Sequence, residues 1–320
     1  MKLGVLTVLF QDRPLDDALE HLVKMGVEAI ELGTGAYPGN AHCNPTELLQ
    51  DSAAIKAYRK NIEDRGLMIS GLSCHGNPLS PDQAFAAESD RVFRETVRLA
   101  AEMEVGVVNL FSGCPGDSEG SKYPNWVTCA WPPEFLKILE WQWEEKVIPY
   151  WQEAGAFAEK AGVKLAFEMH PGFVVYNPET LLRLRQAVGP VIGANYDPSH
   201  LFWQGIDAVA SIHYLGEAIH HFHAKDTFID QRNVAVNGVL DTKPYSQMAQ
   251  RSWTFRTVGY GHDQFTWRAI MSALRMVGYD YVVSIEHEDA LASIDEGLSK
   301  AVSFLQGVLL KEQPAEMWWA

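Results

Sequence analysis

Short apolar runs alternate with longer segments of helical period along the whole chain, and this alternation is the sequence feature that most constrains the fold. The apolar runs are rich in Val, Ile and Leu, which is typical of strands buried in a parallel sheet, and the helical segments between them indicate repeated βα units. We expect strands at residues 2–8, 29–35, 69–76, 107–113, 164–171, 192–200, 219–226 and 281–289. We expect helices at residues 15–26, 53–66, 92–106, 150–162, 178–189 and 267–278, several of which end on a glycine as helix C-termini commonly do.

Eight βα units are the number that closes a (β/α)8 TIM barrel, so the predicted fold class is α/β. The chain has 320 residues, of which 47% are hydrophobic. This length fits one large barrel domain over residues 1–320, and neither a linker nor a low-complexity tract divides it. Two connections are longer than simple βα loops, at about residues 113–146 and 227–262, and loops of that size in a compact domain are usually functional.

The first long connection and the C-terminal tail carry tryptophans. Trp126 and Trp131 could either wall a pocket or pack onto the barrel. Trp318 and Trp319 would be unusual as exposed side chains, so we expect the protein's own barrel or a second subunit to cover them.

The charge and the cysteines exclude several classes of function. A formal net charge of -15 argues against nucleic-acid and anionic membrane partners, because phosphate binding needs clustered Lys and Arg. The four cysteines have no CxxC spacing, and the first residues contain no long apolar segment typical of a secretion signal. We therefore expect a cytoplasmic protein without a membrane span, and the acidic charge is compatible with an enzyme acting on a small neutral substrate.

Polar residues gather at the C-terminal ends of the predicted strands, where the active sites of TIM barrels lie. Four of these ends carry side chains able to bind a divalent cation: Glu168, Asp197, His223 and Glu286. Each alone is weak evidence, because polar residues collect at strand ends in any case. Three carboxylates converging on one barrel mouth would repel one another unless a cation neutralised them. A mixed oxygen and nitrogen set suits Mn²⁺, Mg²⁺ or Co²⁺ better than a structural zinc site.

These residues also carry a resemblance to a known family. Glu168, the segment Asp197-Pro198-Ser199-His200, the segment His223-Ala224-Lys225-Asp226 and a Glu on the last strand resemble, in order, the xylose isomerase-like TIM barrels. That superfamily contains sugar isomerases and epimerases. Ketose 3-epimerases, inosose-processing enzymes and DNA-repair endonucleases of similar fold share these motifs, so the resemblance indicates the superfamily more firmly than the reaction.

The resemblance implies that the metal is bound by Glu168, Asp197, His223 and Glu286, with Mn²⁺ expected and Mg²⁺ or Co²⁺ as alternatives. Glu288 lies two residues beyond Glu286 on the same strand face and is its main rival as the last ligand.

Several further residues are candidates for substrate binding. The resemblance implies that His200 contacts substrate oxygens. Lys225 follows His223 toward the barrel mouth on the same face, so we expect it to face the substrate. His75, at the end of the third strand, is another candidate. Arg256 precedes a G-x-G turn and resembles the substrate-binding Arg of ketose epimerases, although a loop salt bridge is the other interpretation.

The predicted function is that of a divalent-metal-dependent isomerase or epimerase of a keto-sugar or cyclitol. A cation bound through adjacent carbonyl and hydroxyl oxygens stabilises an enediolate and so acidifies the C–H between them. The resemblance to ketose epimerases implies that Glu168 and Glu286 exchange protons on opposite faces of that carbon. The expected partner is a small sugar, and we expect a homo-oligomer.

Other functions stay open at this point. His170 follows Glu168 in an E-x-H pattern that also resembles eliminases acting on 3-keto-glycosides, in which His170 would be the base and an accessory subunit could be present. The acidic charge disfavours a DNA-repair endonuclease, and so does Asn109. The nucleases of this superfamily that bind three metal ions favour a metal-binding residue at this position, and asparagine is a poor metal ligand. A barrel that binds sugar without catalysis is the remaining alternative.

Overall fold

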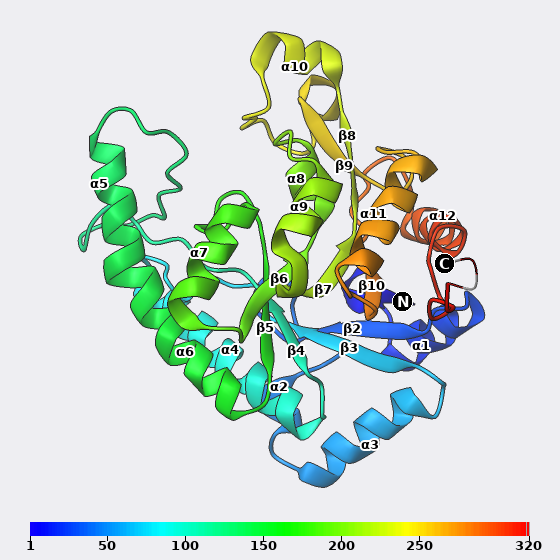
Figure 1. Ribbon diagram of the computed structural model, residues 1–320. Coiled ribbons are helices and arrows are strands. Elements are labelled where there is room, and N and C mark those ends of the chain that lie inside the picture. Colours follow the sequence, from blue (N-terminus) through cyan, green and yellow to red (C-terminus); the bar gives the residue numbers. More distant parts are fainter. Residues whose placement is uncertain (318, 320) are drawn as a thin grey trace.

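Eight parallel strands close into a barrel in the computed structural model, which describes residues 1–317 and 319 (Figure 1). The strands follow one another around the barrel in the order β1, β10, β7, β6, β5, β4, β3, β2. Their bounds are Lys2–Leu6 (β1), Ala29–Gly33 (β2), Met68–Ser73 (β3), Val107–Leu110 (β4), Lys164–Glu168 (β5), Ile192–Tyr196 (β6), Ile219–Ala224 (β7) and Val282–Ile285 (β10). Each falls on a run predicted as a strand, which confirms the TIM-barrel fold class.

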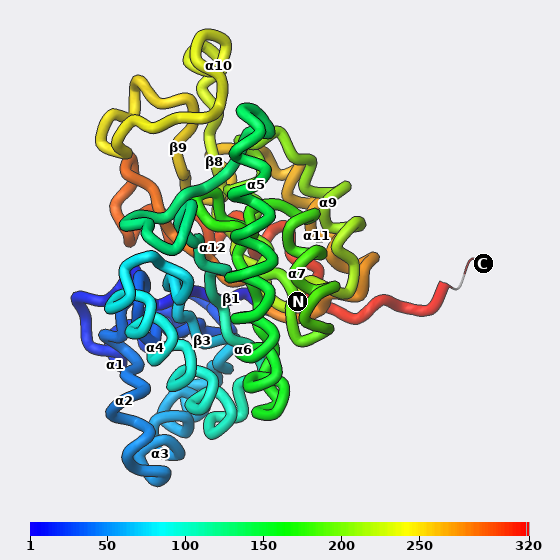
Figure 2. Tube along the Cα trace, turned by 90° about the vertical axis from the view of Figure 1, so that its left-hand side faces the viewer, coloured from blue at the N-terminus to red at the C-terminus, as the bar shows by residue number. Residues whose placement is uncertain are grey.

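Helices surround the barrel on its outside, as the side view in Figure 2 shows. Their bounds are Leu15–Lys24 (α1), Pro45–Leu48 (α2), Ser52–Glu63 (α3), Gln83–Glu102 (α4), Glu134–Trp141 (α5), Ile148–Lys160 (α6), Pro178–Val188 (α7), Pro198–Phe202 (α8), Ala208–Leu215 (α9), Gln231–Asn237 (α10), Gln264–Met276 (α11) and Ile294–Gln306 (α12). All six predicted helices are present, whereas α9 and α12 were not predicted. None of the helices in the described part of the chain is long and apolar enough to cross a membrane.

Polar side chains start several of these helices. Asp51, Asp82 and Asp263 each accept hydrogen bonds from backbone amides in the first turn of α3, α4 and α11. A cap of this kind typically contributes about 1 kcal/mol, because it satisfies an amide that has no partner within the helix. The apolar face of α12 then packs on the barrel through Leu298 and Leu305, both fully buried.

The first long connection is irregular only in its first part. Residues 113–133 contain no helix or strand, and α5 then continues through a π-helical segment, Gln142–Val147, into α6. Trp126 is partly buried against the core, whereas the side chain of Trp131 is 75% exposed. Trp318 lies outside the described residues, and Trp319 is 69% exposed.

The second long connection forms an arm that projects beyond the barrel in both views (Figures 1 and 2). Its strands, β8 (Asp226–Ile229) and β9 (Trp253–Arg256), pair in an antiparallel sheet, and α10 lies between them in sequence. The carboxylate of Asp226 fastens the base of the arm, because one of its oxygens accepts hydrogen bonds from the backbone amides of Gly259, Gly261 and His262 at 2.9, 3.1 and 3.0 Å. The sequence predicted a long functional loop here but not the two strands.

Candidate active site

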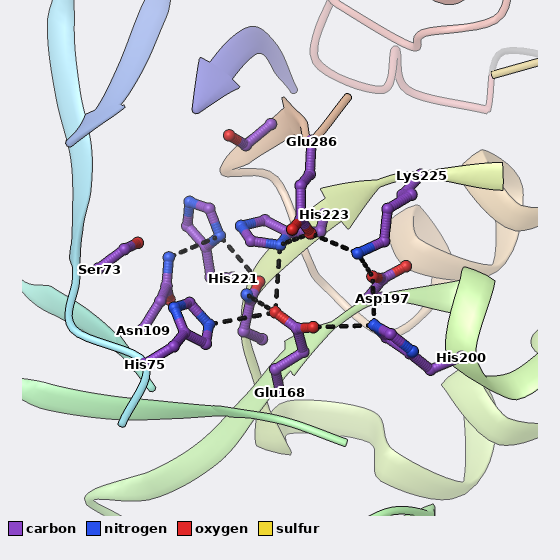
Figure 3. Close-up of polar contacts among 12 residues, drawn as sticks. Ser73, His75, Asn109, Glu168, Asp197, His200, His221, His223, Lys225 and Glu286 are labelled. Carbon is purple, nitrogen blue, oxygen red and sulfur yellow. Dashed lines mark hydrogen bonds and ion pairs between the residues drawn. The ribbon is translucent and has the colours of Figure 1, made fainter. Parts of the chain in front are cut away.

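Four side chains converge at the C-terminal rim of the barrel. Glu168 ends β5, Asp197 follows β6, His223 lies in β7 and Glu286 follows β10. One ligand atom from each lies within 4.8 Å of the other three, and Figure 3 shows them pointing toward one another. We call these four residues the acidic quartet. They are the residues predicted as metal ligands, and they meet because the C-terminal ends of parallel strands lie at one end of a barrel.

Asp197 is held in the quartet by the start of a helix. One carboxylate oxygen accepts a hydrogen bond of 2.8 Å from the backbone amide of Ser199, which caps α8. The other oxygen lies 3.2 Å from Nζ of Lys225 and 3.3 Å from Nε2 of His200. Burial, together with the carboxylates of Glu168 and Glu286, raises the pKa of Asp197 to about 7. Asp197 is therefore only partly ionised near neutral pH while no cation is bound.

Glu168 is surrounded by imidazoles. Its two carboxylate oxygens lie 3.0 Å from Nε2 of His200 and 3.1 Å from Nε2 of His75 (Figure 3). Burial alone would raise the pKa of Glu168, but hydrogen bonds from His200, His223 and His75 outweigh it and lower the pKa well below the usual range. Glu168 is thus an ionised, buried carboxylate, and two predicted substrate-binding residues lie directly against it.

Glu31 was missed by the sequence analysis, yet it fixes the orientation of His223. Both carboxylate oxygens of this β2 residue lie 2.9 Å from Nε2 of His223. The same carboxylate accepts hydrogen bonds of 2.7 Å from Asn109 and 2.8 Å from Ser284, and a further one from Ser73. With Nε2 donating to Glu31, Nδ1 of His223 is left facing the quartet, where it lies 2.9 Å from Glu286.

The signal for Glu31 was present in the sequence. The run Ala29–Gly33 is apolar except for this acid, and the side chain is fully buried. A carboxylate inside a buried strand needs several hydrogen-bond donors or a positive partner. Burial would raise its pKa, but the charges of His223 and His221 and hydrogen bonds outweigh burial and lower it strongly.

Lys225 lies at the edge of the acidic quartet. Its ammonium is 3.0 Å from Glu286, 3.2 Å from Asp197 and 3.4 Å from Glu288, although the side chain is only 2% exposed. Burial would lower its pKa, but these carboxylates outweigh burial and raise it. Glu288 is half-exposed and lies outside the quartet, so the geometry favours Glu286 over its rival as the fourth metal ligand.

His170 stands beside the quartet rather than in it. Its Nδ1 lies 2.6 Å from the backbone oxygen of Pro171, so Nδ1 carries the proton and Nε2 is the free base. The ring centroid lies 4.1 Å from that of His200. Burial, followed by the charges of His200 and Lys225, lowers the pKa of His170 to about 3, although the charge of Glu168 opposes this. His170 is therefore a neutral imidazole at neutral pH.

Arg256 is paired elsewhere. Its guanidinium Nε lies 3.2 and 3.1 Å from the two carboxylate oxygens of Asp289, and the guanidinium sits over the ring of Tyr260. The structure thus shows the salt bridge that was the other interpretation of this residue, and a contact between Arg256 and substrate remains a prediction.

The charges of the site suit a divalent cation. Five carboxylates meet here, from Glu31, Glu168, Asp197, Glu286 and Glu288, and they raise the pKa of Lys225 and, as long as no metal replaces the proton on Nδ1, that of His223. Burial lowers the pKa of His200, His170 and His221, which are therefore neutral. The excess of buried negative charge, and a donor set of three carboxylates and one imidazole, fit Mn²⁺, Mg²⁺ or Co²⁺.

The closed barrel of eight parallel strands is a TIM barrel, and its cluster of charged side chains lies at the C-terminal rim. This rim is where the active sites of TIM-barrel enzymes lie. The chain belongs to the xylose isomerase-like TIM barrel family, whose sequence profile matches residues 19–307. It is 40% identical over 309 residues to the "Uncharacterized protein YfiH" of Bacillus subtilis (strain 168). The matched residues cover 96% of this chain and 98% of that protein.

Solved structures of similar fold include three of interest. The probable 3-DHS dehydratase AsbF of Bacillus anthracis has a TM-score of 0.66 and 18% identity, over 96% of this chain and 99% of that one. D-psicose 3-epimerase, solved in the presence of D-fructose, has a TM-score of 0.61 and 17% identity, over 97% of this chain and 99% of that one. The IOLI protein with a bound zinc atom has a TM-score of 0.64 and 19% identity over 96% of both chains. At these identities the likeness shows the fold alone.

Proposed function

We propose that this chain is a divalent-metal-dependent isomerase or epimerase that moves a proton at the carbon beside the carbonyl of a keto-sugar or cyclitol. The observation that carries the proposal is the convergence of Glu168, Asp197, His223 and Glu286 within 4.8 Å at the barrel rim. A cation held by these residues, with Mn²⁺ preferred, would supply Lewis acidity that weakens the C–H bond next to the carbonyl.

The proton itself is moved by the chain's own carboxylates. Glu168 and Glu286 come from β5 and from the end of β10, which are separated around the barrel by β6 and β7, so they approach the substrate from different sides. Glu168 stays ionised because three imidazoles surround it, as a general base must. Return of the proton to the other face of the same carbon gives epimerisation, and return to the neighbouring carbon gives isomerisation.

Buried donors around the quartet can hold the substrate. His75 and His200 lie against Glu168, and Lys225 lies against Glu286, so each can donate a hydrogen bond to a sugar hydroxyl or carbonyl oxygen beside a reacting carboxylate. The family membership supports an enzyme of this kind, and the epimerase named among the structural neighbours supports ketose chemistry. The zinc in the IOLI neighbour supports a divalent metal.

Elimination is a second candidate, and His170 favours it. This neutral imidazole lies beside the quartet, and its Nε2 is free to accept a proton. In a 3-keto-glycoside it would remove the proton on C2, the electron pair would form the C1–C2 double bond, and the bond to the C1 substituent would break. One of the structural neighbours is named a probable dehydratase, and loss of water is an elimination.

One experiment separates the two candidates. The protein with Mn²⁺ is incubated in D₂O with panels of free ketoses, inososes and 3-keto-glycosides, and the products are followed by NMR. Deuterium beside the carbonyl without a released substituent supports isomerisation or epimerisation, whereas release supports elimination. Glu168→Gln, which keeps the size of the side chain, is expected to abolish either reaction. Absence of both reactions across the panels would contradict both candidates.

We also propose, from the net charge of -15, that the enzyme acts on small molecules and not on nucleic acid. The four cysteines without CxxC spacing support the cytoplasm as its compartment. A homo-oligomer, or a small accessory subunit if elimination is the reaction, remains part of this proposal.

A further inference from the structure

Two hollows lie beside the acidic quartet, under the arm formed by β8 and β9. One has a volume of about 520 Å³ and is lined by His170, Tyr245, Phe255 and Glu288 among others. The other has a volume of about 400 Å³, and its lining includes His170, Tyr245, Trp126, Trp203 and Trp253. Pockets of roughly 300–1,000 Å³ accept drug-sized ligands, so the space exceeds what one monosaccharide fills. We call the two hollows together the aromatic cleft.

The wall of the aromatic cleft is a series of packed rings. The indoles of Trp203 and Trp253 stack at 4.6 Å with an interplanar angle of 4°. Trp253 contacts Phe255 at 5.3 Å, and Phe255 stacks on Tyr245 at 5.8 Å and 22°. The outermost ring, Tyr245, is 56% exposed although it lines both hollows. Trp203 and Trp253 are themselves buried, so the rings open to a ligand are Phe255 and Tyr245, which favour an aromatic partner in stacked or edge-to-face contact.

Charged groups hold this wall in place. The guanidinium of Arg251 lies 4.3 Å from the ring of Tyr245 and 4.7 Å from that of Trp253, and the residue is only 3% exposed. It also donates hydrogen bonds to the backbone oxygens of Trp253 and Lys243. The backbone amide of Ser252 donates to the carboxylate of Asp241 at 2.6 Å. The rings are therefore fixed by a buried cation and by backbone contacts before any ligand arrives.

The aromatic cleft is continuous with the proposed catalytic centre. His170 lines both hollows, and His200 lines the smaller one while its Nε2 lies 3.0 Å from Glu168. Glu288 lines the larger hollow and lies 3.4 Å from Nζ of Lys225. A single molecule can thus place a polar end at the quartet and an apolar end against Tyr245.

We propose that the aromatic cleft binds a planar aromatic substituent carried by the sugar, so that the substrate is an aryl-substituted sugar rather than a free monosaccharide. This inference rests on the proposed function, because the quartet is taken as the site of the sugar. It adds that the substituent lies under the arm, on the side of His170, His200 and Tyr245.

The test is a binding measurement that requires no turnover. Phenyl and methyl β-D-glycosides of glucose, galactose and xylose are titrated by calorimetry into the full-length protein with Mn²⁺. We expect at least one phenyl glycoside to bind about tenfold more tightly than its methyl counterpart, from the stacking of aromatic rings. Tyr245→Ala is expected to remove most of this difference and to leave methyl glycoside and Mn²⁺ binding unchanged.

Two control variants sharpen the result. Tyr245→Phe retains the ring and is expected to retain the preference, while Tyr214→Ala removes a similarly exposed tyrosine on α9 and is expected to change nothing. Equal affinity for phenyl and methyl glycosides, or no binding of any phenyl glycoside, would overturn the proposal. A Tyr245→Ala variant that alters the oligomeric state in sedimentation, without an aryl preference in the parent, would assign the cleft to a second copy of the chain instead.

The result is independent of the reaction. An aryl preference that depends on Tyr245, together with no Mn²⁺-dependent exchange in D₂O, would keep the aromatic cleft and reject the proposed function. Turnover of free ketoses without an aryl preference would keep the proposed function and reject the aromatic cleft as a binding site for aryl groups.

Discussion

Both carboxylate oxygens of Glu31 lie 2.9 Å from Nε2 of His223, across the interior of the barrel from β2 to β7. The carboxylate can only accept a hydrogen bond here, so the proton of the imidazole is drawn to Nε2 and Nδ1 is directed at the acidic quartet. The residue that orients this proposed metal ligand thus comes from β2, whereas the quartet comes from β5, β6, β7 and β10.

Glu31→Gln is therefore expected to weaken Mn²⁺ binding by about 10- to 100-fold, because a glutamine amide no longer specifies which imidazole nitrogen carries the proton. Calorimetry measures the affinity, and ¹⁵N NMR of the imidazole reports the tautomer of His223. Glu28→Gln, a more exposed carboxylate one residue before the same strand, is the control. Unchanged Mn²⁺ affinity in Glu31→Gln would show that Glu31 does not position the ligand.

Asp197→Asn separates the two roles of this side chain. Asparagine is a good helix cap, so α8 is expected to remain, while the carboxylate whose pKa is raised to about 7 by burial is removed. We expect the metal-free variant to melt no lower than the parent but to lose the stabilisation by Mn²⁺. At a metal concentration 100 times Kd, that stabilisation is about 2.7 kcal/mol in the parent. Differential scanning calorimetry with and without Mn²⁺ measures both effects, and a retained Mn²⁺ effect would argue against Asp197 as a ligand.

His170→Ala is expected to leave Mn²⁺ affinity nearly unchanged and to lower turnover, because the ring lies beside the quartet and not in it. Loss of a general base typically costs about 10²–10⁴ in rate, so a loss of this size would point to His170 as the base and hence to elimination. Metal affinity and turnover are measured side by side with Glu168→Ala. A loss of metal equal to that in Glu168→Ala would make His170 a ligand and would contradict the division of roles.

The free energy of unfolding is expected to decrease as the pH is lowered, over a pH range that His220 partly sets. This β7 residue is 8% exposed, and burial, followed by the charges of Lys164 and Arg185, lowers its pKa from 6.5 to about 4. The unfolded chain therefore binds a proton below pH 6.5 that the folded chain binds only near pH 4, and unfolding becomes easier as the pH falls between these values. For one group the effect is about 3 kcal/mol. Urea denaturation at pH 7 and pH 4 should show a smaller pH dependence in His220→Gln than in the parent, and an equal pH dependence would refute the assignment.

The sequence predicted the barrel and the quartet because both depend on local patterns. Each strand is a separate apolar run, and the quartet residues follow at strand ends that a barrel brings together whatever the loops do. Asp197 also stands in a D-P-S-H segment whose capping geometry is local. These features need no knowledge of which strands are neighbours.

Partners chosen by long-range packing could not be predicted in the same way. Glu31 and His223 are 192 residues apart, and Arg256 pairs with Asp289 across 33 residues, so no spacing rule connects either pair. β8 and β9 are four residues each and lie in a mostly polar stretch, too short for a period to be recognised. Asp226 of β8 also accepts hydrogen bonds from three backbone amides that follow β9, a contact that no local pattern predicts.

The arm formed by β8, α10 and β9 leaves the barrel after β7 and returns before α11, and it contributes no strand to the closed sheet. Its length and composition can therefore vary between relatives without shifting the strand register that assembles the quartet. If the proposals above hold, proton transfer and the choice of substituent are carried by separate parts of the chain. Exchange of this one insertion would then change the molecules that the barrel accepts while the reaction stays the same.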